Sequence, residues 1–247
     1  MRLAIFGTGA IGAYFGGRLA LAGEDVVFVA RGAQLHALRN NGLTLRSADG
    51  DQLVQPLQVG DDPRAFGTVD VVLLGVKAWQ VPEAARQMQP LIGDATCVLP
   101  LQNGVDAPMI LVGALGEQHV LGGMAKIIAE TVEPGVVEHL AVAPYIALGE
   151  LDNARSERVD SLAAVLTRSG VVAEVPDDIH RVMWEKFLFI SAVSGVGAVT
   201  RTPLGVLREL PETREMIRGA SVSPSVSLFV QRGSNGGGRR RGRPARR

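Results

Sequence analysis

The sequence predicts an α/β fold, in which a doubly wound parallel sheet is followed by a second, all-helical domain. Before residue 177 the apolar segments are continuous rather than alternating, which indicates strands buried on both faces. These segments alternate with stretches of helical periodicity, whereas only helical patterns follow residue 177. Because 47% of the 247 residues are apolar and 20% are charged, the composition excludes a disordered or collagen-like protein for most of the chain.

The start of the chain is one predicted β-α-β unit. Residues 3–6 are a short apolar strand, a glycine-rich turn follows, and a helix then runs to Gly23. A glycine just past the last turn is typical of a helix C-terminus. Residues 26–29 form the next strand.

The rest of the first domain continues this pattern. Further strands are expected over residues 43–46, 53–59, 69–76, 97–101, 120–128 and 136–142. The first two of these are expected to form a small antiparallel excursion before the parallel pattern resumes. Helices are expected over residues 82–92 and 156–168.

The second domain is predicted to begin with a long helix. Asp177 and Asp178 can cap this helix, which runs through Phe187, and Pro203 starts another that reaches about Arg218. We therefore place the domain boundary near Pro176. The predicted parts are a nucleotide-binding domain over 1–176, the start of a helical domain over 177–220, and an atypical tail over 221–247.

The tail is rich in Ser, Gly and Arg and holds too few apolar groups to complete a domain. It could be a basic arm for nucleic acid or acidic surfaces. Alternatively, it could be an out-of-frame translation that replaces the true C-terminal helices, because the chain has 22 Arg and three Lys and therefore GC-rich codons. The abrupt break favours the second interpretation, so we expect a disordered or frameshifted tail, an incomplete helical domain and no nucleic-acid partner.

Charge and cysteine content restrict the remaining function classes. Seven of the 25 basic residues lie in 232–247, where no acid occurs, so residues 1–231 carry 18 bases against 25 acids. The single cysteine, Cys97, cannot form an intramolecular disulfide, and no Cys/His spacing indicates a metal site. We expect a cytoplasmic protein without a metal.

Membrane targeting is not expected. Glycines interrupt the apolar start of the chain, which argues against a signal peptide. The apolar stretch 187–199 is shorter than the ~18 residues that a membrane span requires. Without further helices to cover it, this stretch favours association, so a homodimer is a candidate assembly.

The turn after the first strand carries a G-x-G-x-x-G motif. Its residues are Gly7, Thr8, Gly9, Ala10, Ile11 and Gly12. The first glycine permits the turn, the second lets the backbone approach a pyrophosphate, and the third lets helix and strand pack closely. Directly after a strand and at the start of a helix, the motif predicts a Rossmann-type dinucleotide site, although an ordinary glycine turn would read the same way.

Arg31 indicates which dinucleotide binds. It follows the second strand in Ala30-Arg31-Gly32, where an acid would bind an adenosine ribose and an arginine a 2′-phosphate. No acid stands between Asp25 and Asp49. We therefore predict NADP(H), with a solvent-exposed loop arginine as the alternative.

Two polar residues follow later strands of the predicted sheet. Lys77 ends the strand over 69–76, and Asn103 follows the strand over 97–101. The carboxyl ends of parallel strands border the ligand crevice, so both residues are predicted to bind cofactor and substrate. Each could instead be an ordinary turn residue.

Lys186 is a candidate general acid because it lies inside the most apolar helix of the second domain. Burial disfavours the ammonium form and lowers a lysine pKa toward the range that suits proton transfer near neutrality. Reduction of a ketone needs such a proton for the developing alkoxide. The alternative is a lysine at the solvated edge of the helix.

As a set, these motifs resemble the ketopantoate reductases, also called 2-dehydropantoate 2-reductases, over residues 1–219. The shared segments are the glycine motif, Ala-Arg31-Gly, Val-Lys77-Ala, Leu-Gln-Asn103-Gly and Trp-Glu-Lys186-Phe. The resemblance implies NADPH-dependent reduction of 2-dehydropantoate to (R)-pantoate in the synthesis of pantothenate and coenzyme A. It also implies that Lys186 donates the proton and that Lys77 and Asn103 line the cleft.

Two departures from the family keep other functions open. The family often has Asn four and eight positions after the catalytic lysine, whereas this chain has Ile190 and Ser194. Ser194 could still bind substrate, but Ile190 cannot donate a hydrogen bond, which favours a paralogue that reduces another small 2-oxoacid. The family's later Glu and Ser have no match in the tail, which favours an NADP-binding protein without turnover.

Overall fold

The computed structural model describes residues 1–220, and the expectations for the tail lie outside this range. The chain divides into two compact units, Met1–Met183 and Trp184–Arg247. This division falls inside a helix that starts soon after Pro176, the position where the sequence places the boundary.

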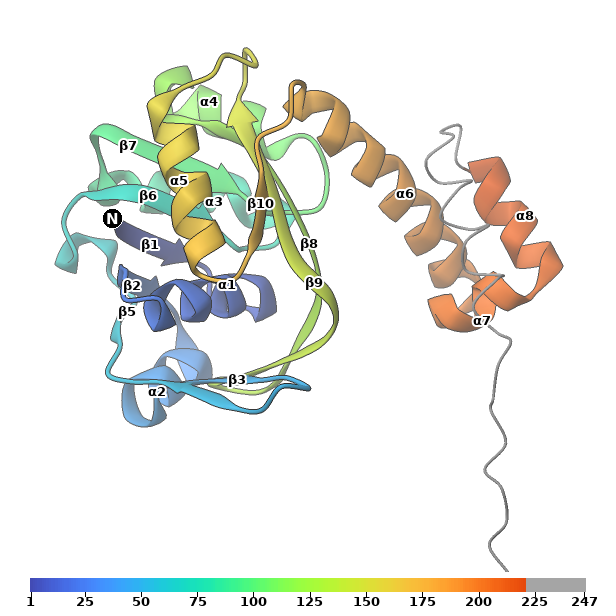
Figure 1. Cartoon of the computed structure of the whole chain (residues 1–247), viewed down its shortest axis with the longest axis horizontal. Helices are drawn as coiled ribbons and strands as arrows, with labels where there is room; N and C mark the ends of the chain where they lie inside the picture. The colour runs from blue at the N-terminus through green and yellow to red at the C-terminus, as the bar shows by residue number, and fades with distance from the viewer. Residues whose placement is uncertain (221–247) are drawn as a thin grey trace, which may run out of the picture. The chain divides into compact units, whose positions relative to one another are not determined.

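The first unit contains a sheet of five parallel strands (Figure 1). Their order is β5 (Gln58–Gly60), β2 (Asp25–Val29), β1 (Arg2–Phe6), β6 (Val69–Leu74) and β7 (Ile92–Pro100). The chain builds outward from β1 to β2 and β5 on one side, and then to β6 and β7 on the other. The strand order therefore reverses between β1 and β6, which is where such sheets bind ligands.

Side chains of β1 alternate between two apolar cores, so this strand is buried on both faces. Leu3 and Ile5 pack in the core that includes α1 (Ala10–Leu21), whereas Phe6 packs in the core that includes α3 (Val81–Gln87). This arrangement confirms the predicted doubly wound α/β fold, and its period of two is the pleat of a strand.

Three more helices belong to the first unit: α2 (Gly32–Asn41), α4 (Ala107–Leu115) and α5 (Glu157–Arg168). The side chain of Ser156 accepts a hydrogen bond from the Val159 amide and caps α5, which matches the helix predicted over 156–168. The sequence did not reveal α4, because this short helix is apolar on nearly every side.

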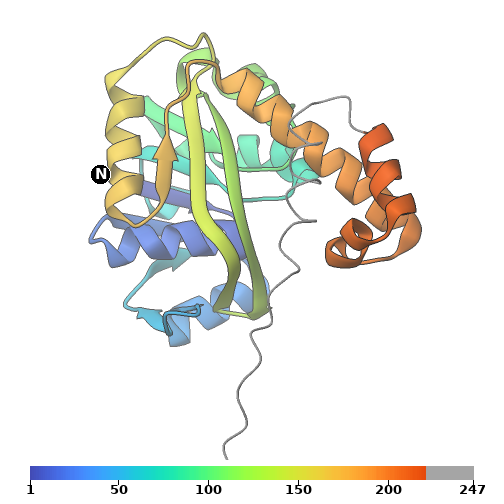
Figure 2. The ribbon, with the colours of Figure 1, turned by 45° about the vertical axis from the view of Figure 1, so that its right-hand side comes forward.

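A second sheet packs beside the first. Its order is β10 (Val172–Glu174), β9 (Val136–Glu150), β3 (Leu43–Arg46) and β4 (Gln52–Val54), and β8 (Leu121–Glu133) pairs with β9. Figure 2 shows β8 and β9 as one long hairpin along the side of the unit. β8 extends past the predicted residue 128 because residues 129–133, next to the turn, are mostly exposed, so an apolar pattern does not reveal them. β9 also extends past the predicted residue 142, to Glu150, although residues 146–149 are buried.

Two predicted elements differ from the structure at prolines. The strand expected over 53–59 is two strands, β4 and β5, which belong to different sheets on either side of the cis Gln55–Pro56 bond. The helix expected over 82–92 ends at Gln87 and is followed by a 3₁₀ turn, Gln89–Leu91. Pro90 disfavours helical backbone at the residue before it.

The described part of the second unit is helical. The helices are α6 (Ile179–Thr200), which begins in the first unit, α7 (Leu204–Glu209) and α8 (Pro211–Ala220). Ala192, Val196, Leu207 and Ile217 form a small buried cluster among them. The single helix expected from Pro203 to Arg218 is wrong, since Pro211 ends one helix and starts the next.

The Asp178 carboxylate accepts a hydrogen bond from the Arg181 amide at 3.0 Å, as expected for a cap of α6. With 22 residues, α6 is longer than the apolar stretch in the sequence. Among residues 1–220 it is the one helix long and apolar enough to cross a membrane, by length and composition alone.

Candidate functional site

The glycine turn between β1 and α1 depends on close backbone contacts. Gly7 has φ +97°, and a Cβ there would lie 2.6 Å from Val76 Cγ1. A Cβ at Gly12 would lie 2.0 Å from the Gly7 carbonyl oxygen. Both distances are shorter than any real Cβ contact, so these two positions require glycine.

Gly9 differs from these two, because a Cβ built on it would meet no atom within 4 Å. It is the N-cap residue of α1, which has no capping side chain and no acid in its first turn. The first helical hydrogen bond runs from the Ala13 amide to the Gly9 carbonyl, which leaves the preceding amides without helical partners. This terminus is therefore open to an anion, which the helix dipole also favours.

Arg31 lies at the carboxyl end of β2, directly before α2, and is exposed. Its Nη2 donates a hydrogen bond to Gln87 Oε1 at 2.5 Å, and Gln87 Nε2 in turn donates to Glu83 Oε1 at 2.6 Å. Gln87 and Glu83, both on α3, thus hold the Arg31 guanidinium at the end of β2. This strand pairs with β1, which leads into the glycine turn. Residues such as Gln87 escaped the sequence analysis because they lie on a distant helix.

Lys77 and Asn103 are both exposed at the same edge of the sheet. Lys77 follows β6 and precedes a 3₁₀ turn, where its amide donates to Gln80 Oε1 at 3.0 Å. Asn103 follows β7. The structure therefore brings the glycine motif, Arg31, Lys77 and Asn103 to the carboxyl ends of four adjacent strands.

Gln102 also belongs to this edge, a position for which the sequence predicted no role. Its Nε2 donates to the Leu74 carbonyl at 2.7 Å and to the Val76 carbonyl at 3.2 Å. It thereby joins the loop after β7 to the loop after β6. Its position directly before Asn103 was the only sequence feature that could have suggested a role. The two hydrogen bonds could not be predicted, because they depend on how β6 and β7 pair.

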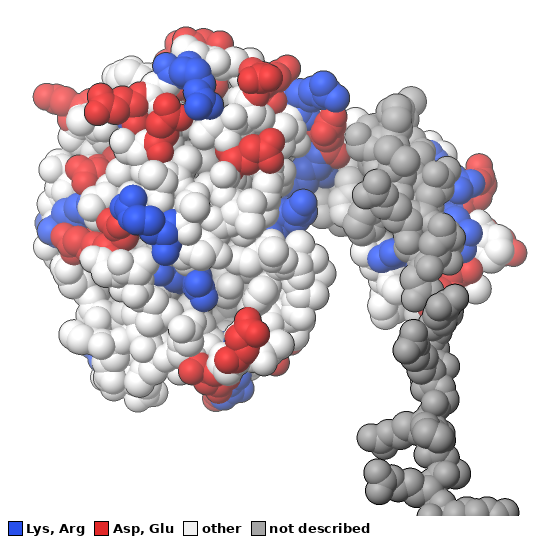
Figure 3. Space-filling view, viewed as in Figure 1, with Lys and Arg blue, Asp and Glu red and all other residues white. Residues whose placement is uncertain are grey.

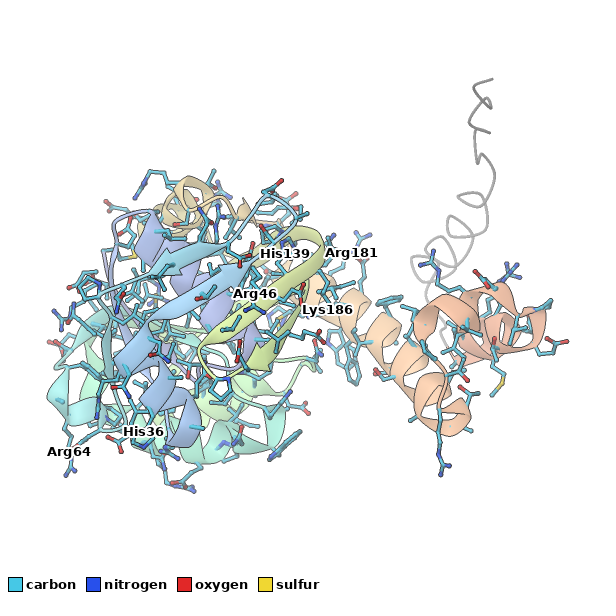
Figure 4. The ribbon with its side chains drawn as sticks, turned by 90° about the horizontal axis from the view of Figure 1, so that it is seen from below. His36, Arg46, Arg64, His139, Arg181 and Lys186 are labelled. Atoms are coloured by element: carbon cyan, nitrogen blue, oxygen red, sulfur yellow. The ribbon has the colours of Figure 1, made fainter. Side chains whose placement is uncertain are left out.

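The second unit carries Lys186, which is labelled on α6 in Figure 4. The side chain is partly buried, and desolvation lowers the pKa of its ammonium to about 8. Ile190 and Ser194 follow at four and eight residues, so they share the helix face of Lys186. Ser194 is exposed and Ile190 is partly buried.

The remaining chemically distinctive residues have structural contacts. The rings of His119, His139 and His180 each hydrogen-bond a backbone carbonyl, and Figure 4 shows His139 on β9 and His36 on α2. Burial raises the pKa of the Cys97 thiol to about 11, so it stays protonated at neutral pH. Residues 1–220 contain no cluster of three or more His, Cys, Asp or Glu suited to a metal.

The family described as ketopantoate reductase PanE/ApbA matches residues 3–153, which include the glycine motif, Arg31, Lys77 and Asn103. The chain belongs to this family. This confirms the predicted family, and it makes the protein an oxidoreductase of the ketopantoate reductase type.

Relatives and solved structures agree with this assignment. The 2-dehydropantoate 2-reductase of Mesorhizobium japonicum is 33% identical over 239 residues, which cover 88% of this chain and 73% of that protein. The structure of 2-dehydropantoate 2-reductase from Geobacter metallireducens has a TM-score of 0.88 at 29% identity and covers 96% of this chain and 83% of its own. D-mandelate dehydrogenase, solved with NADH and anilino(oxo)acetate, shares the fold, with a TM-score of 0.84 at 21% identity over 94% of this chain and 79% of its own.

Two glycine variants separate folding from ligand access at the turn. Gly12→Ala should lower the free energy of unfolding by about 1–3 kcal/mol or prevent folding, because its methyl group would collide with the Gly7 carbonyl. Gly9→Ala should change stability by about 1 kcal/mol or less, yet weaken the binding of a nicotinamide dinucleotide, with NADPH as the probe, at least about tenfold by obstructing the helix terminus. Urea unfolding and NADPH fluorescence titration measure these effects. Equal losses of stability in both variants would contradict the assigned roles.

Proposed function

We propose that this chain reduces 2-dehydropantoate to (R)-pantoate with NADPH, as a soluble cytoplasmic enzyme of pantothenate and coenzyme A synthesis. The observation that carries the proposal is Lys186, whose desolvated ammonium has a pKa of about 8 in a chain of this family. Relatives named 2-dehydropantoate 2-reductase support the substrate. Basic and acidic side chains are interspersed on the face of the first unit in Figure 3, which suits a small-molecule enzyme better than a nucleic-acid binder.

The residues of the first unit fit a nicotinamide dinucleotide. The open space before Gly9 and the unpaired amides of α1 would hold the pyrophosphate. Arg31 would bind the 2′-phosphate, which supports NADPH over NADH. Lys77 and Asn103 would contact the nicotinamide half and the substrate.

Reduction of a 2-oxoacid requires a hydride at the carbonyl carbon and a proton at the carbonyl oxygen. When bound, NADPH supplies the hydride. Lys186 donates its proton to the oxygen as the carbon–oxygen π bond breaks, becomes a neutral amine and takes a proton from solvent before the next turnover. With a pKa of about 8, its ammonium is the main form at neutral pH and a stronger acid than an ordinary lysine.

Ile190 favours a second candidate, a paralogue that reduces another small 2-oxoacid. It stands on the Lys186 face of α6 and offers no hydrogen bond, so only Ser194 remains there to bind a substrate hydroxyl. A smaller or more apolar 2-oxoacid would suit this face better than 2-dehydropantoate. The third candidate is an NADP-binding protein without turnover, because the expected helical domain is incomplete. A homodimer is the proposed assembly for any of the three.

Steady-state NADPH oxidation with a panel of 2-oxoacids separates these candidates. The proposal predicts the highest kcat/KM for 2-dehydropantoate, with (R)-pantoate as the product. A higher value for another 2-oxoacid would establish the paralogue. Tight NADPH binding without oxidation by any panel member would establish the binding protein.

Arg31→Ala tests the choice of cofactor. Losing a charge-assisted contact with the 2′-phosphate should weaken NADPH binding about ten- to a hundredfold while NADH binding stays almost unchanged. Arg39→Ala is the matched control, because Arg39 is also exposed and lies in the helix that Arg31 precedes, and it should affect neither cofactor. Equal losses of affinity for NADPH and NADH in Arg31→Ala would show that Arg31 does not bind the 2′-phosphate.

Lys186 is tested by turnover and by its pH dependence. Lys186→Ala should lower kcat by roughly 10²–10⁴ with NADPH affinity kept. Because only the ammonium form donates a proton, wild-type reduction should decline as pH rises through about 8. Lys126→Ala, a lysine whose ammonium lies over the Tyr145 ring, should retain both the rate and the decline. If Lys186→Ala keeps the wild-type turnover, Lys186 is not the proton donor and is an ordinary lysine at the solvated edge of the helix.

A further inference from the structure

We propose that Gln102 is a positioning residue. It sets the spacing of Lys77 and Asn103 at the carboxyl edge of the parallel sheet, where the cofactor is proposed to bind. This inference rests on the proposed function, because Lys77 and Asn103 are assigned there to cofactor and substrate. Gln102 itself is not proposed to contact either ligand. It acts through the two loops that it joins.

The hydrogen bonds of Gln102 connect two adjacent strand ends. Its backbone leads directly into Asn103, while its Nε2 reaches the Leu74 and Val76 carbonyls at 2.7 and 3.2 Å. The Leu74 carbonyl also accepts the Leu101 amide at 3.1 Å, which continues the β6–β7 ladder. The bond to Val76 lies beyond the end of that ladder, so it is a link that regular strand pairing does not provide.

The hydrogen bond from Gln102 to the Val76 carbonyl affects the position of Lys77, because Val76 directly precedes Lys77. Its carbonyl belongs to the peptide bond that leads into Lys77, so fixing that oxygen fixes the plane from which Lys77 leaves the sheet. Its side chain and amide lie where a Cβ on Gly7 would collide, at 2.6 and 2.8 Å. One amide group therefore holds the Asn103 loop and the Lys77 loop in register with the glycine turn.

The orientation of the Gln102 amide is determined by its partners. The reverse orientation would place its oxygen against two carbonyl oxygens. In the observed orientation Oε1 is buried and accepts no hydrogen bond from the described part of the chain. A buried acceptor without a partner is unfavourable, so stability alone would favour an apolar side chain of the same length. The presence of an amide at position 102 is therefore explained by the two hydrogen bonds that position the loops after β6 and β7.

Gln102→Met removes the donors and the unpaired oxygen while keeping the side-chain length. The matched control is Gln89→Met, because Gln89 also donates from Nε2 to a backbone carbonyl, that of Ala114 at 3.1 Å, but precedes β7 at the opposite edge of the sheet. In the full chain, Gln102→Met should raise the NADPH Kd at least about fivefold and lower kcat/KM for 2-dehydropantoate at least about tenfold. The thermal midpoint should fall no further than in Gln89→Met, whose Kd and kcat/KM should match wild type.

Gln102→Glu gives a second measurement that a purely structural role would not change. Its ionised carboxylate would face two carbonyl oxygens, so NADPH binding should be weaker than in Gln102→Met at neutral pH. Protonation restores one donor, so the affinity gap from wild type should narrow as pH falls through the usual range of a carboxyl pKa. Equal effects of Gln102→Met and Gln89→Met on both constants, or a pH-independent gap in Gln102→Glu, would overturn the proposal.

The two hypotheses fail in different ways. If wild type binds NADPH but reduces no 2-oxoacid, the proposed function is wrong, and the NADPH Kd of these variants still decides the role of Gln102. If wild type reduces 2-dehydropantoate and Gln102→Met matches it in Kd and kcat/KM, the positioning role is wrong and the proposed function stands.

Discussion

The first unit depends on the close approach of three backbone segments at the point where the strand order reverses. The Gly7 carbonyl would lie 2.0 Å from a Cβ on Gly12 and 2.7 Å from one on Gly75, so β1, α1 and β6 meet there only because side chains are absent. This contact directs the N-terminus of α1 toward the carboxyl edge of the sheet. Arg31, Lys77 and Asn103 are then placed by the strands that they follow.

Much of this arrangement could be predicted from the sequence because its signals are local. A strand, a glycine motif and a helix end at Gly23 follow each other directly, and Arg31, Lys77 and Asn103 each stand just past an apolar strand. The bonds of Gln87 and Gln102 join elements far apart in the chain, so no local pattern reveals them. For the same reason the sequence could not assign β4 and β5 to different sheets.

The second unit shows what a helical pattern can and cannot reveal. A lysine among apolar neighbours predicted a desolvated ammonium, and burial does lower the pKa of Lys186 to about 8. The same pattern could not separate α7 from α8, because their periodicities run together and only Pro211 marks the break. In the proposed reaction α6 supplies the proton through Lys186.

The proposed activity of this chain is the transfer of a hydride from a nicotinamide cofactor to a 2-oxoacid. The most direct measurement uses NADPH that carries deuterium at the transferable position, together with 2-dehydropantoate and the full chain, and examines the product by NMR. We expect pantoate with deuterium on the carbon that bears the new hydroxyl, in amounts equal to the NADPH oxidised. Oxidation of NADPH without labelled product, or no oxidation despite NADPH binding, would contradict the proposed activity.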